Sequence, residues 1–232
     1  MMSRFLAAFA ALLLTVSSAL ADDNVVVVEL YTSQGCSSCP PADNLLGQIA
    51  DRDNIIALAL HVDYWDYIGW TDDFASPAHT ARQRGYARAK GTKMIYTPQM
   101  VIQGETHVVG NKPMDVADAI NSYVRSSVPV DVSLERSGDM VRVQARRIGR
   151  VPQGVSVHVV TFVPRATRDI RAGENRGRTL SYHNIVRDWR TIDSWSGGDV
   201  YTADVRVAAD QPVAVIFQAP GHGPVLGAAQ LR

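Results

Sequence analysis

The stretch YTSQGCSSCPPAD, residues 31–43, contains the only two cysteines of the 232-residue chain, Cys36 and Cys39. A run of valines precedes it and predicts a buried strand over residues 24–31. Two prolines follow the second cysteine, where a helix can begin because the missing proline N–H has no intrahelical partner in the first turn. The pattern therefore predicts a strand, a loop with a C-x-x-C motif, and a helix that starts at the motif.

The flanking sequence continues as alternating strands and helices. Residues 54–62 form a second apolar run, so the β-α-β order favours a parallel pair of strands. The other elements expected in this half are a loop or short helix at 63–74, a helix at 77–90, strands at 96–103 and 106–109, and a helix at 113–124.

The pattern changes after residue 129, where little of the sequence favours a helix. Strands are expected at 130–134, 140–145, 155–163, 200–207 and 212–218. Several short strands separated by turn residues are typical of an all-β sandwich of about 100 residues. We expect a boundary between the two halves near residues 126–129.

The position of the cysteines favours redox chemistry over a structural role. A disulfide within C-x-x-C closes too short a loop to constrain the unfolded chain much. A cysteine at a helix N-terminus is held as the reactive thiolate by the backbone N–H groups. We expect Cys36 to be the exposed nucleophile and Cys39 the resolving thiol, with Ser37 and Ser38 hydrogen-bonding to the thiolate.

A second motif, Tyr96-Thr97-Pro98-Gln99, completes a resemblance. The order of elements resembles the thioredoxin superfamily, in which a cis-proline faces the reactive disulfide and the preceding residue binds substrate. The resemblance implies these roles for Pro98 and Thr97, and the region around them is similar to glutaredoxins. An ordinary proline at a strand edge is the alternative.

More specifically, the chain resembles a family of secreted bacterial thioredoxin-like proteins of unknown function (domain of unknown function 1223). The similar stretches are residues 31–43, 61–66 and 96–99. The expected fold class is an α/β thioredoxin-like domain at 22–127, with an insertion at 63–91, followed by a smaller all-β, immunoglobulin-like sandwich domain at 128–232.

The N-terminus predicts export. Arg4, an apolar run and Ala19-Leu20-Ala21 form a signal peptide over residues 1–21, so we expect cleavage after Ala21 and a periplasmic or secreted protein. We expect no membrane insertion, because no later segment is long and apolar enough. A formal net charge of +0 gives no field that would favour nucleic acid. The oligomeric state is not predicted.

The aromatic and acidic segment 63–74 has two interpretations. It follows the carboxyl end of a strand, where ligands bind in open α/β sheets, so Asp63 and Trp65 are candidate substrate-binding residues. Asp63 is the first choice for a carboxylate that accepts protons during exchange. The alternative is a loop whose rings only cover the sheet.

A further feature is the excess of arginine in residues 165–190, where seven arginines accompany three acidic residues. A solvated surface or a set of salt bridges is the main interpretation, and docking of an acidic partner is the other.

Three functions remain open. The first is an enzyme, a thiol–disulfide oxidoreductase acting on protein or small-molecule thiols and disulfides, with no cofactor. The second is a non-catalytic binding module with a static disulfide. The third is a copper- or zinc-handling protein, although no metal site is predicted because a structural zinc site needs four ligands and no other cysteine exists.

Overall fold

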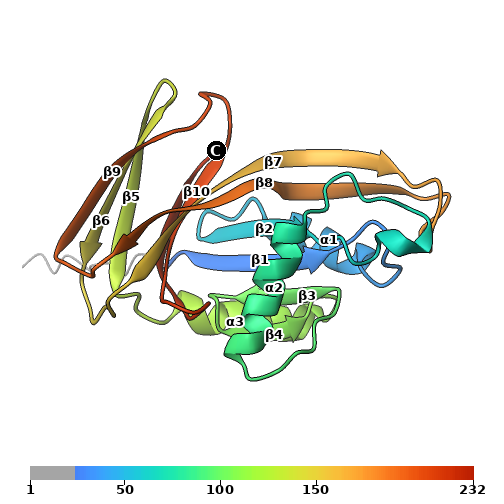
Figure 1. The fold of residues 1–232 in the computed structure, drawn as a ribbon, viewed down its shortest axis with the longest axis horizontal. Helices are drawn as coiled ribbons and strands as arrows, with labels where there is room; N and C mark the ends of the chain where they lie inside the picture. The colour runs from blue at the N-terminus through green and yellow to red at the C-terminus, as the bar shows by residue number, and fades with distance from the viewer. Residues whose placement is uncertain (1–23) are drawn as a thin grey trace, which may run out of the picture.

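The computed structural model describes residues 24–232, so the expected signal peptide at 1–21 lies outside the described residues. Residues 24–232 form two sheets and three α-helices, and Figure 1 shows how these are arranged. The helices are α1 (Pro40–Ile49), α2 (Pro77–Ala89) and α3 (Pro113–Val124), and η1 (Asp66–Ile68) is a short 3₁₀ helix. None of the helices in residues 24–232 is long and apolar enough to cross a membrane.

Eight strands form the larger sheet, in the order β11-β10-β7-β8-β2-β1-β3-β4. Strand β1 pairs with β2 in parallel, as the sequence predicts, and with β3 in the antiparallel sense. The bounds are β1 (Val26–Thr32), β2 (Ile55–His61), β3 (Gln99–Ile102), β4 (Thr106–Val109), β7 (Val155–Asp169), β8 (Thr179–Trp195), β10 (Val213–Gln218) and β11 (Val225–Leu231).

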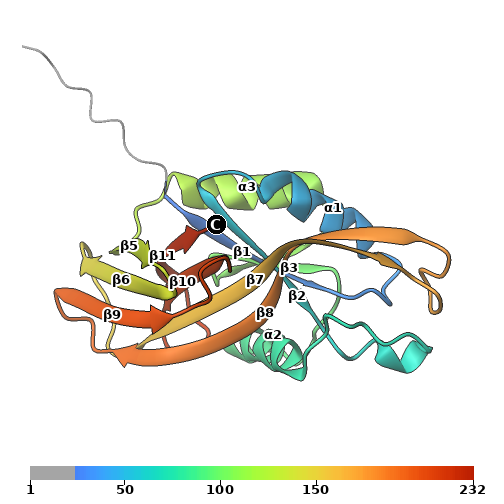
Figure 2. The same cartoon turned by 90° about the horizontal axis from the view of Figure 1, so that it is seen from above.

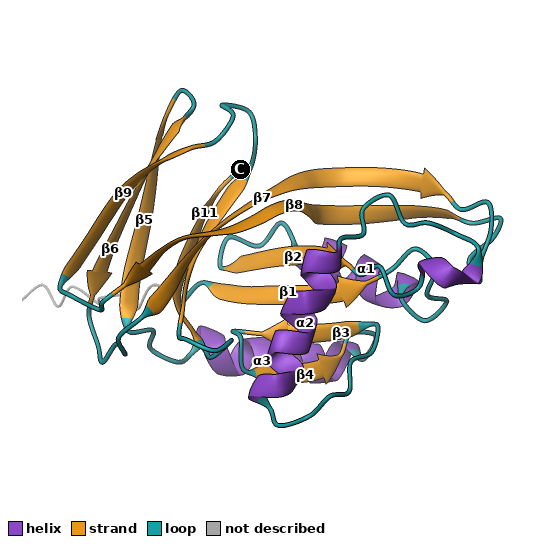
Figure 3. Ribbon diagram, in the orientation of Figure 1, coloured by secondary structure: helices purple, strands orange, loops and turns teal. Residues whose placement is uncertain are grey.

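The helices cover both faces of this sheet. Figures 2 and 3 show α1 and α3 on one face and α2 on the other. Residues of α1 and α3 pack with alternate residues of β1 and β2, including Val26 and Val28, whereas Val27 and Tyr31 of β1 face the side on which Tyr86 of α2 is buried. Strand β1 is buried along its whole length because both of its faces are covered.

A second sheet of three strands stands beside one end of the first. Its order is β5-β6-β9, with β5 (Val130–Ser137), β6 (Met140–Arg147) and β9 (Val200–Arg206). Valines of β6 and Tyr201 of β9 pack against Val157, Val215 and Phe217 of the large sheet. This core lies between two layers of strands. The second layer includes β7 and β10, which belong to the larger sheet.

The expected fold class is therefore wrong. Instead of an α/β thioredoxin-like domain followed by a separate all-β domain, strands from both halves of the chain form one mixed sheet. The connection is β8, which pairs in parallel with β2 at Ala59 and Ile185. The Asn184 side chain also donates a hydrogen bond to the Ala57 carbonyl. The edge of β2 would otherwise expose unpaired N–H and C=O groups, and β8 covers it.

A buried ion pair within the first half is also hydrogen-bonded to the second half. The Arg82 guanidinium of α2 donates to both oxygens of Glu29 on β1, from Nε at 2.7 Å and from Nη2 at 2.8 Å. The hydroxyls of Tyr31 and Tyr86 donate to the same carboxylate, and Arg82 Nη2 also donates to Gln218 of β10. Burial raises the pKa of Glu29, but the Arg82 charge and these hydrogen bonds outweigh burial, so the pKa lies below its ordinary value.

We predict that Glu29→Gln alone lowers the free energy of unfolding by about 3–5 kcal/mol, because it leaves the buried Arg82 charge uncompensated. The double variant Glu29→Gln/Arg82→Met has no unpaired charge. Its loss in the free energy of unfolding should be much smaller than the sum of the losses in the two single variants. Urea denaturation of the four proteins measures this coupling.

The matched control is Asp204→Asn, which breaks the exposed Arg142–Asp204 pair. We expect that loss to stay below about 1 kcal/mol. Additive losses from Glu29→Gln and Arg82→Met would contradict a tightly coupled pair.

Candidate active site around the Cys36–Cys39 disulfide

Cys36 and Cys39 form a disulfide between the carboxyl end of β1 and the start of α1. Cys39 is the N-cap residue of α1, and the two prolines occupy the first helical positions, where no N–H is needed. Two turn-like hydrogen bonds shape the loop, from the Cys36 amide to Ser33 O and from the Cys39 amide to Cys36 O. The sequence prediction of a C-x-x-C motif at a helix N-terminus is confirmed.

Both cysteines are 0% exposed, whereas Ser37 and Ser38 lie on the surface. The expectation that Cys36 is exposed is therefore wrong. The serine hydroxyl that approaches a sulfur is that of Ser38, 3.4 Å from Cys36 Sγ. Attack on the disulfide requires some part of its surroundings to move.

The cover on one side is the turn between β7 and β8. The Asn175 side chain, 1% exposed, donates two hydrogen bonds of 2.9 Å, to Gln34 O and to Cys36 O. Next to it, the Glu174 carboxylate accepts a hydrogen bond from the Ser37 amide at 3.0 Å, and hydrogen bonds from Ser37 lower the pKa of Glu174. Sequence analysis missed both residues, because nothing in a local pattern indicates that this turn reaches the cysteines.

The cover on the other side comes from the segment after β2. A Cβ atom on Gly35 would lie 3.0 Å from Ile68 Cδ1 and 3.3 Å from Trp65 Cβ, so only glycine allows this close approach without a shift. Trp65 Nε1 donates a 2.8 Å hydrogen bond to the Thr97 hydroxyl. The structure thus brings together Trp65 and Thr97, two of the predicted substrate-binding residues.

The Thr97–Pro98 peptide bond is cis, as the resemblance to the thioredoxin superfamily implies. Pro98 O accepts a hydrogen bond from the Gly110 amide. A Cβ on Gly110 would lie 3.2 Å from Ala42 of α1 and 3.3 Å from Pro98 Cβ. The proline loop therefore lies beside the first turn of α1, three residues after the second cysteine.

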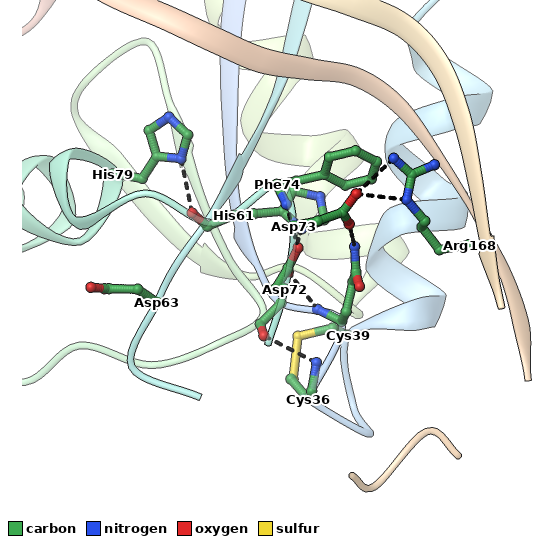
Figure 4. Close-up of polar contacts among 12 residues, drawn as sticks. Cys36, Cys39, His61, Asp63, Asp72, Asp73, Phe74, His79 and Arg168 are labelled. Carbon is green, nitrogen blue, oxygen red and sulfur yellow. Dashed lines mark hydrogen bonds and ion pairs between the residues drawn. A yellow bond between two sulfur atoms is a disulfide. The ribbon is translucent and has the colours of Figure 1, made fainter. Parts of the chain in front are cut away.

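A buried hydrogen-bond network supports the loop before Cys36. Asp72 Oδ2 accepts from the Gln34 amide at 2.8 Å and from His61 Nδ1 at 2.7 Å, while Asp72 Oδ1 accepts from the Phe74 amide. Because a carboxylate oxygen can only accept, Nδ1 of His61 carries the proton in this contact. Figure 4 shows His61 and Asp72 beside the disulfide.

Asp63 occupies a different place. The Thr80 hydroxyl of α2 donates a hydrogen bond to its carboxylate, and its amide donates to the same hydroxyl. Figure 4 shows Asp63 apart from the disulfide and from the His61–Asp72 pair. The structure therefore brings Asp63 to α2, and it brings Asp72, which sequence analysis did not single out, to the cysteine loop.

Another carboxyl that sequence analysis missed, Asp43, lies behind the disulfide. It is on α1 four residues after Cys39, a spacing that puts two side chains on the same helix face with about 5–6 Å between their Cβ atoms. Asp43 is 4% exposed, and neither carboxyl oxygen has a hydrogen-bond partner among residues 24–232. Burial raises the pKa of this carboxyl to about 7, although the nearby His61 and Thr32 oppose the rise.

Other polar groups around Asp43 are also buried without partners in the described part of the chain. They are the Thr32 hydroxyl, Nε2 of His61 and the Tyr182 hydroxyl. The His61 and Tyr182 rings pack edge to face with centroids 4.9 Å apart. A cavity of about 220 Å³, lined in part by Pro40 and Asp43, adjoins the cluster. Unpartnered buried polar groups are uncommon, and they occur where chemistry or conformational change uses them.

This arrangement can exchange both electrons and protons. A helix N-terminus stabilises a thiolate formed by reduction of the disulfide. A carboxyl with a pKa near 7 can donate or accept a proton near neutral pH. Within residues 24–232, no group of three or more His, Cys, Asp or Glu side chains is arranged to hold a metal ion.

Comparison with known proteins places the chain among relatives of unknown function. A family model described as "Protein of unknown function (DUF1223)" matches residues 27–218. A crystal structure of a protein from Agrobacterium tumefaciens is 34% identical and superimposes with a TM-score of 0.78, covering 91% of this chain and 96% of that one. HBP35 of Porphyromonas gingivalis, 12% identical, has a similar fold with a TM-score of 0.54 over 90% of this chain and 75% of that one. No curated protein matches.

We predict that Asn175→Ala speeds reduction of the disulfide by dithiothreitol. Loss of two buried hydrogen bonds makes local opening of the β7–β8 turn easier by about 1–3 kcal/mol, which corresponds to a rate increase of roughly five- to a hundredfold. Quenched alkylation followed by mass spectrometry measures the rate.

The control for general loss of stability is Val143→Ala, in the core of the three-stranded sheet. This variant should be reduced at the wild-type rate under native conditions. Equal acceleration in both variants would show that the turn does not limit access to the sulfurs.

Proposed function

This chain belongs to the DUF1223 family of proteins of unknown function, and we propose that it is a thiol–disulfide oxidoreductase whose redox group is the Cys36–Cys39 pair. The observation that carries the proposal is the position of Asp43. A buried carboxyl with a pKa of about 7, which has no hydrogen-bond partner among residues 24–232, lies one helical turn beyond Cys39 on the same face of α1. Burying a polar group that lacks a hydrogen-bond partner costs stability, so its presence here supports a functional role.

The proposed reaction is exchange with a dithiol partner. A partner thiolate attacks one sulfur, the Cys36–Cys39 bond breaks, and a mixed disulfide and one cysteine thiolate form. Protonated Asp43 donates its proton to that thiolate. The second partner thiol, as its thiolate, attacks the mixed disulfide and releases the other cysteine as a thiolate, so the partner leaves oxidised and the two cysteines have gained two electrons. The two protons that the partner thiols release to solvent protonate this second thiolate and restore the proton of Asp43. The reverse sequence oxidises the protein and reduces a partner disulfide.

The roles of the two cysteines follow from their places on the helix. Cys36 precedes α1 and is the proposed sulfur for the mixed disulfide, while Cys39, the N-cap residue, is the resolving thiol next to Asp43. The loop at Pro98, with its Gly110 contact, and the Trp65–Thr97 hydrogen bond form the proposed substrate-binding side. These features support a reaction of the thioredoxin-superfamily type at this site, with protein or small-molecule thiols and disulfides as partners. We also propose that the protein is exported, with cleavage after Ala21.

A binding module with a static disulfide is the second candidate. The observation in its favour is the complete burial of both cysteines beneath the β7–β8 turn. The reduction potential distinguishes the two functions. For an oxidoreductase we expect a value between about −270 and −120 mV, whereas a static structural disulfide lies below about −300 mV. Equilibration with glutathione or dithiothreitol buffers measures it, and Cys39→Ser should additionally trap mixed disulfides that Cys36→Ser does not.

We predict that Asp43→Asn changes the pH dependence of stability and of exchange. In the wild type, Asp43 keeps its proton up to a pKa of about 7 in the folded chain but releases it near its ordinary pKa of 3.8 in the unfolded chain. The free energy of unfolding should therefore fall as the pH rises from about 4 to about 7, and this carboxyl should cause no further change above that pH. Asp43→Asn should remove this fall, on the order of 1–4 kcal/mol. Urea denaturation from pH 4 to 8 measures it.

The same variant should slow exchange and remove an inflection near pH 7 from the rate profile, which a purely structural role would not do. Asp118→Asn, an exposed substitution on α3, is the control and should match the wild type in both measurements. An unchanged rate profile in Asp43→Asn would leave the disulfide without its proposed proton donor.

A further inference from the structure

A cleft of about 620 Å³ lies between α2 and the strands β7, β8 and β10. Figure 2 shows α2 alongside the middle of β8. The walls of the cleft are rich in cationic and imidazole side chains. Three arginines and three histidines contribute: Arg82, Arg88, Arg187, His79, His158 and His222.

The floor of the cleft is a stacked pair of side chains. The Arg82 guanidinium lies over the Trp189 ring, 3.7 Å from its centroid. Its Nε and Nη2 are engaged by Glu29, Tyr86 and Gln218, so the group is held rigidly, but Nη1 makes no hydrogen bond within residues 24–232. Nε1 of Trp189 is buried and is likewise unpartnered in the described residues. Two fixed N–H donors therefore have no protein acceptor.

Positive charges lie at both ends of the cleft. Ser76, at the start of α2, and Arg88, in its last turn, are twelve residues apart, which is about 18 Å at the helical rise of 1.5 Å. Arg187 lies near His79, and Arg88 lies near His222, close enough in each case to lower the pKa of the imidazole. Neither Arg88 nor Arg187 forms an ion pair with another described residue.

Few acidic side chains lie near the cleft, and each of them lies close to a basic side chain. Glu29 is paired with Arg82, and Asp72 with His61. Asp188, which lines the cleft, lies 3.8 Å from Arg190. Burial, together with the arginines, lowers the pKa of His79, His158 and His222, and that of His158 to about 4. The imidazoles are therefore neutral at neutral pH and leave the arginine charge unmatched.

We propose that this cleft binds a small organic anion that carries two or more carboxylate or phosphate groups. One anionic group binds at Arg82 Nη1, and the other binds toward Arg88 or toward Arg187, because a small anion does not span the whole length of the cleft. Guanidinium groups suit such anions because several N–H donors can bind one oxyanion. The volume limits the ligand to a small molecule. This site is separate from the cysteines and does not depend on the proposed redox function.

Titration calorimetry at constant ionic strength, with citrate, pyrophosphate and acetate as probes, tests the proposal. We expect citrate or pyrophosphate to bind at one site, at least about tenfold more tightly than acetate, because a second anionic group adds a charge-assisted hydrogen bond that acetate cannot form. Tighter binding of citrate assigns carboxylate chemistry, and tighter binding of pyrophosphate assigns phosphate. Binding of neither polyanion at 10 mM, on the order of the weakest metabolite affinities, overturns the proposal.

Variants locate the binding. Of Arg88→Gln and Arg187→Gln, the variant that removes the contacting arginine should weaken binding by about tenfold, and wild-type affinity in both variants would overturn the site. Arg84→Gln is the matched control, because Arg84 is exposed on the same helix but does not line the cleft. In NMR titrations the bound probe should raise the pKa of His79, His158 and His222 and leave that of His183 unchanged. An equal effect of Arg84→Gln, or equal shifts of all four histidines, would indicate non-specific charge attraction and would overturn the site.

Discussion

The bidentate contact between Arg82 and Glu29 is the interaction on which the arrangement of this molecule depends. A carboxylate in the middle of a fully buried strand is unfavourable unless a cation and further donors surround it. Here the donors come from α2, and Gln218 of β10 and Trp189 of β8 complete the environment of the guanidinium. Satisfying one charge on β1 thus fixes α2 against the sheet and requires strands from the second half of the chain. Hydrophobic packing alone specifies such a geometry less strictly.

The cysteine pair is sheltered between two segments that are remote in sequence. The segment after β2 packs against Gly35, and the β7–β8 turn holds the backbone at Gln34 and Cys36. Behind the disulfide, Asp43 and its neighbours form a polar interior in a region otherwise filled by apolar side chains. The exposed part of the motif is reduced to Ser37 and Ser38. The shielding of the two sulfur atoms and the buried carboxyl beside them, rather than the presence of two cysteines, therefore distinguish this site from a simple crosslink.

Much of the first half was predictable because its signals are local. Strand β1, the helix start at Cys39-Pro40, the parallel β1–β2 pair and α2 each follow from apolar runs, proline positions or helical spacing within a few residues. The disulfide and the cis bond at Pro98 were likewise expected from short motifs.

The rest was not predictable, for equally physical reasons. Strand β8 includes Arg187, Asp188 and Arg190, and this polar pattern favours a solvated surface in isolation. It forms a strand because its partners, β7 and β2, provide backbone hydrogen bonds, and one of these partners lies far away in sequence. The same holds for the site. Asp72, Glu174 and Asn175 acquire their contacts only from tertiary structure, and Asp43 looked like an ordinary first-turn acidic residue.

The distances in sequence between these partners have a consequence for how the protein is made. Asn184 reaches Ala57 across 127 residues, and Asn175 reaches Cys36 across 139. Because the chain is made from its N-terminus, both cysteines are present well before the strand that completes the sheet. They are also present before the turn that covers them. Pairings of such long range also form slowly. During synthesis the two thiols are open to oxidants and reductants, and the last part of the chain to be made ends that period.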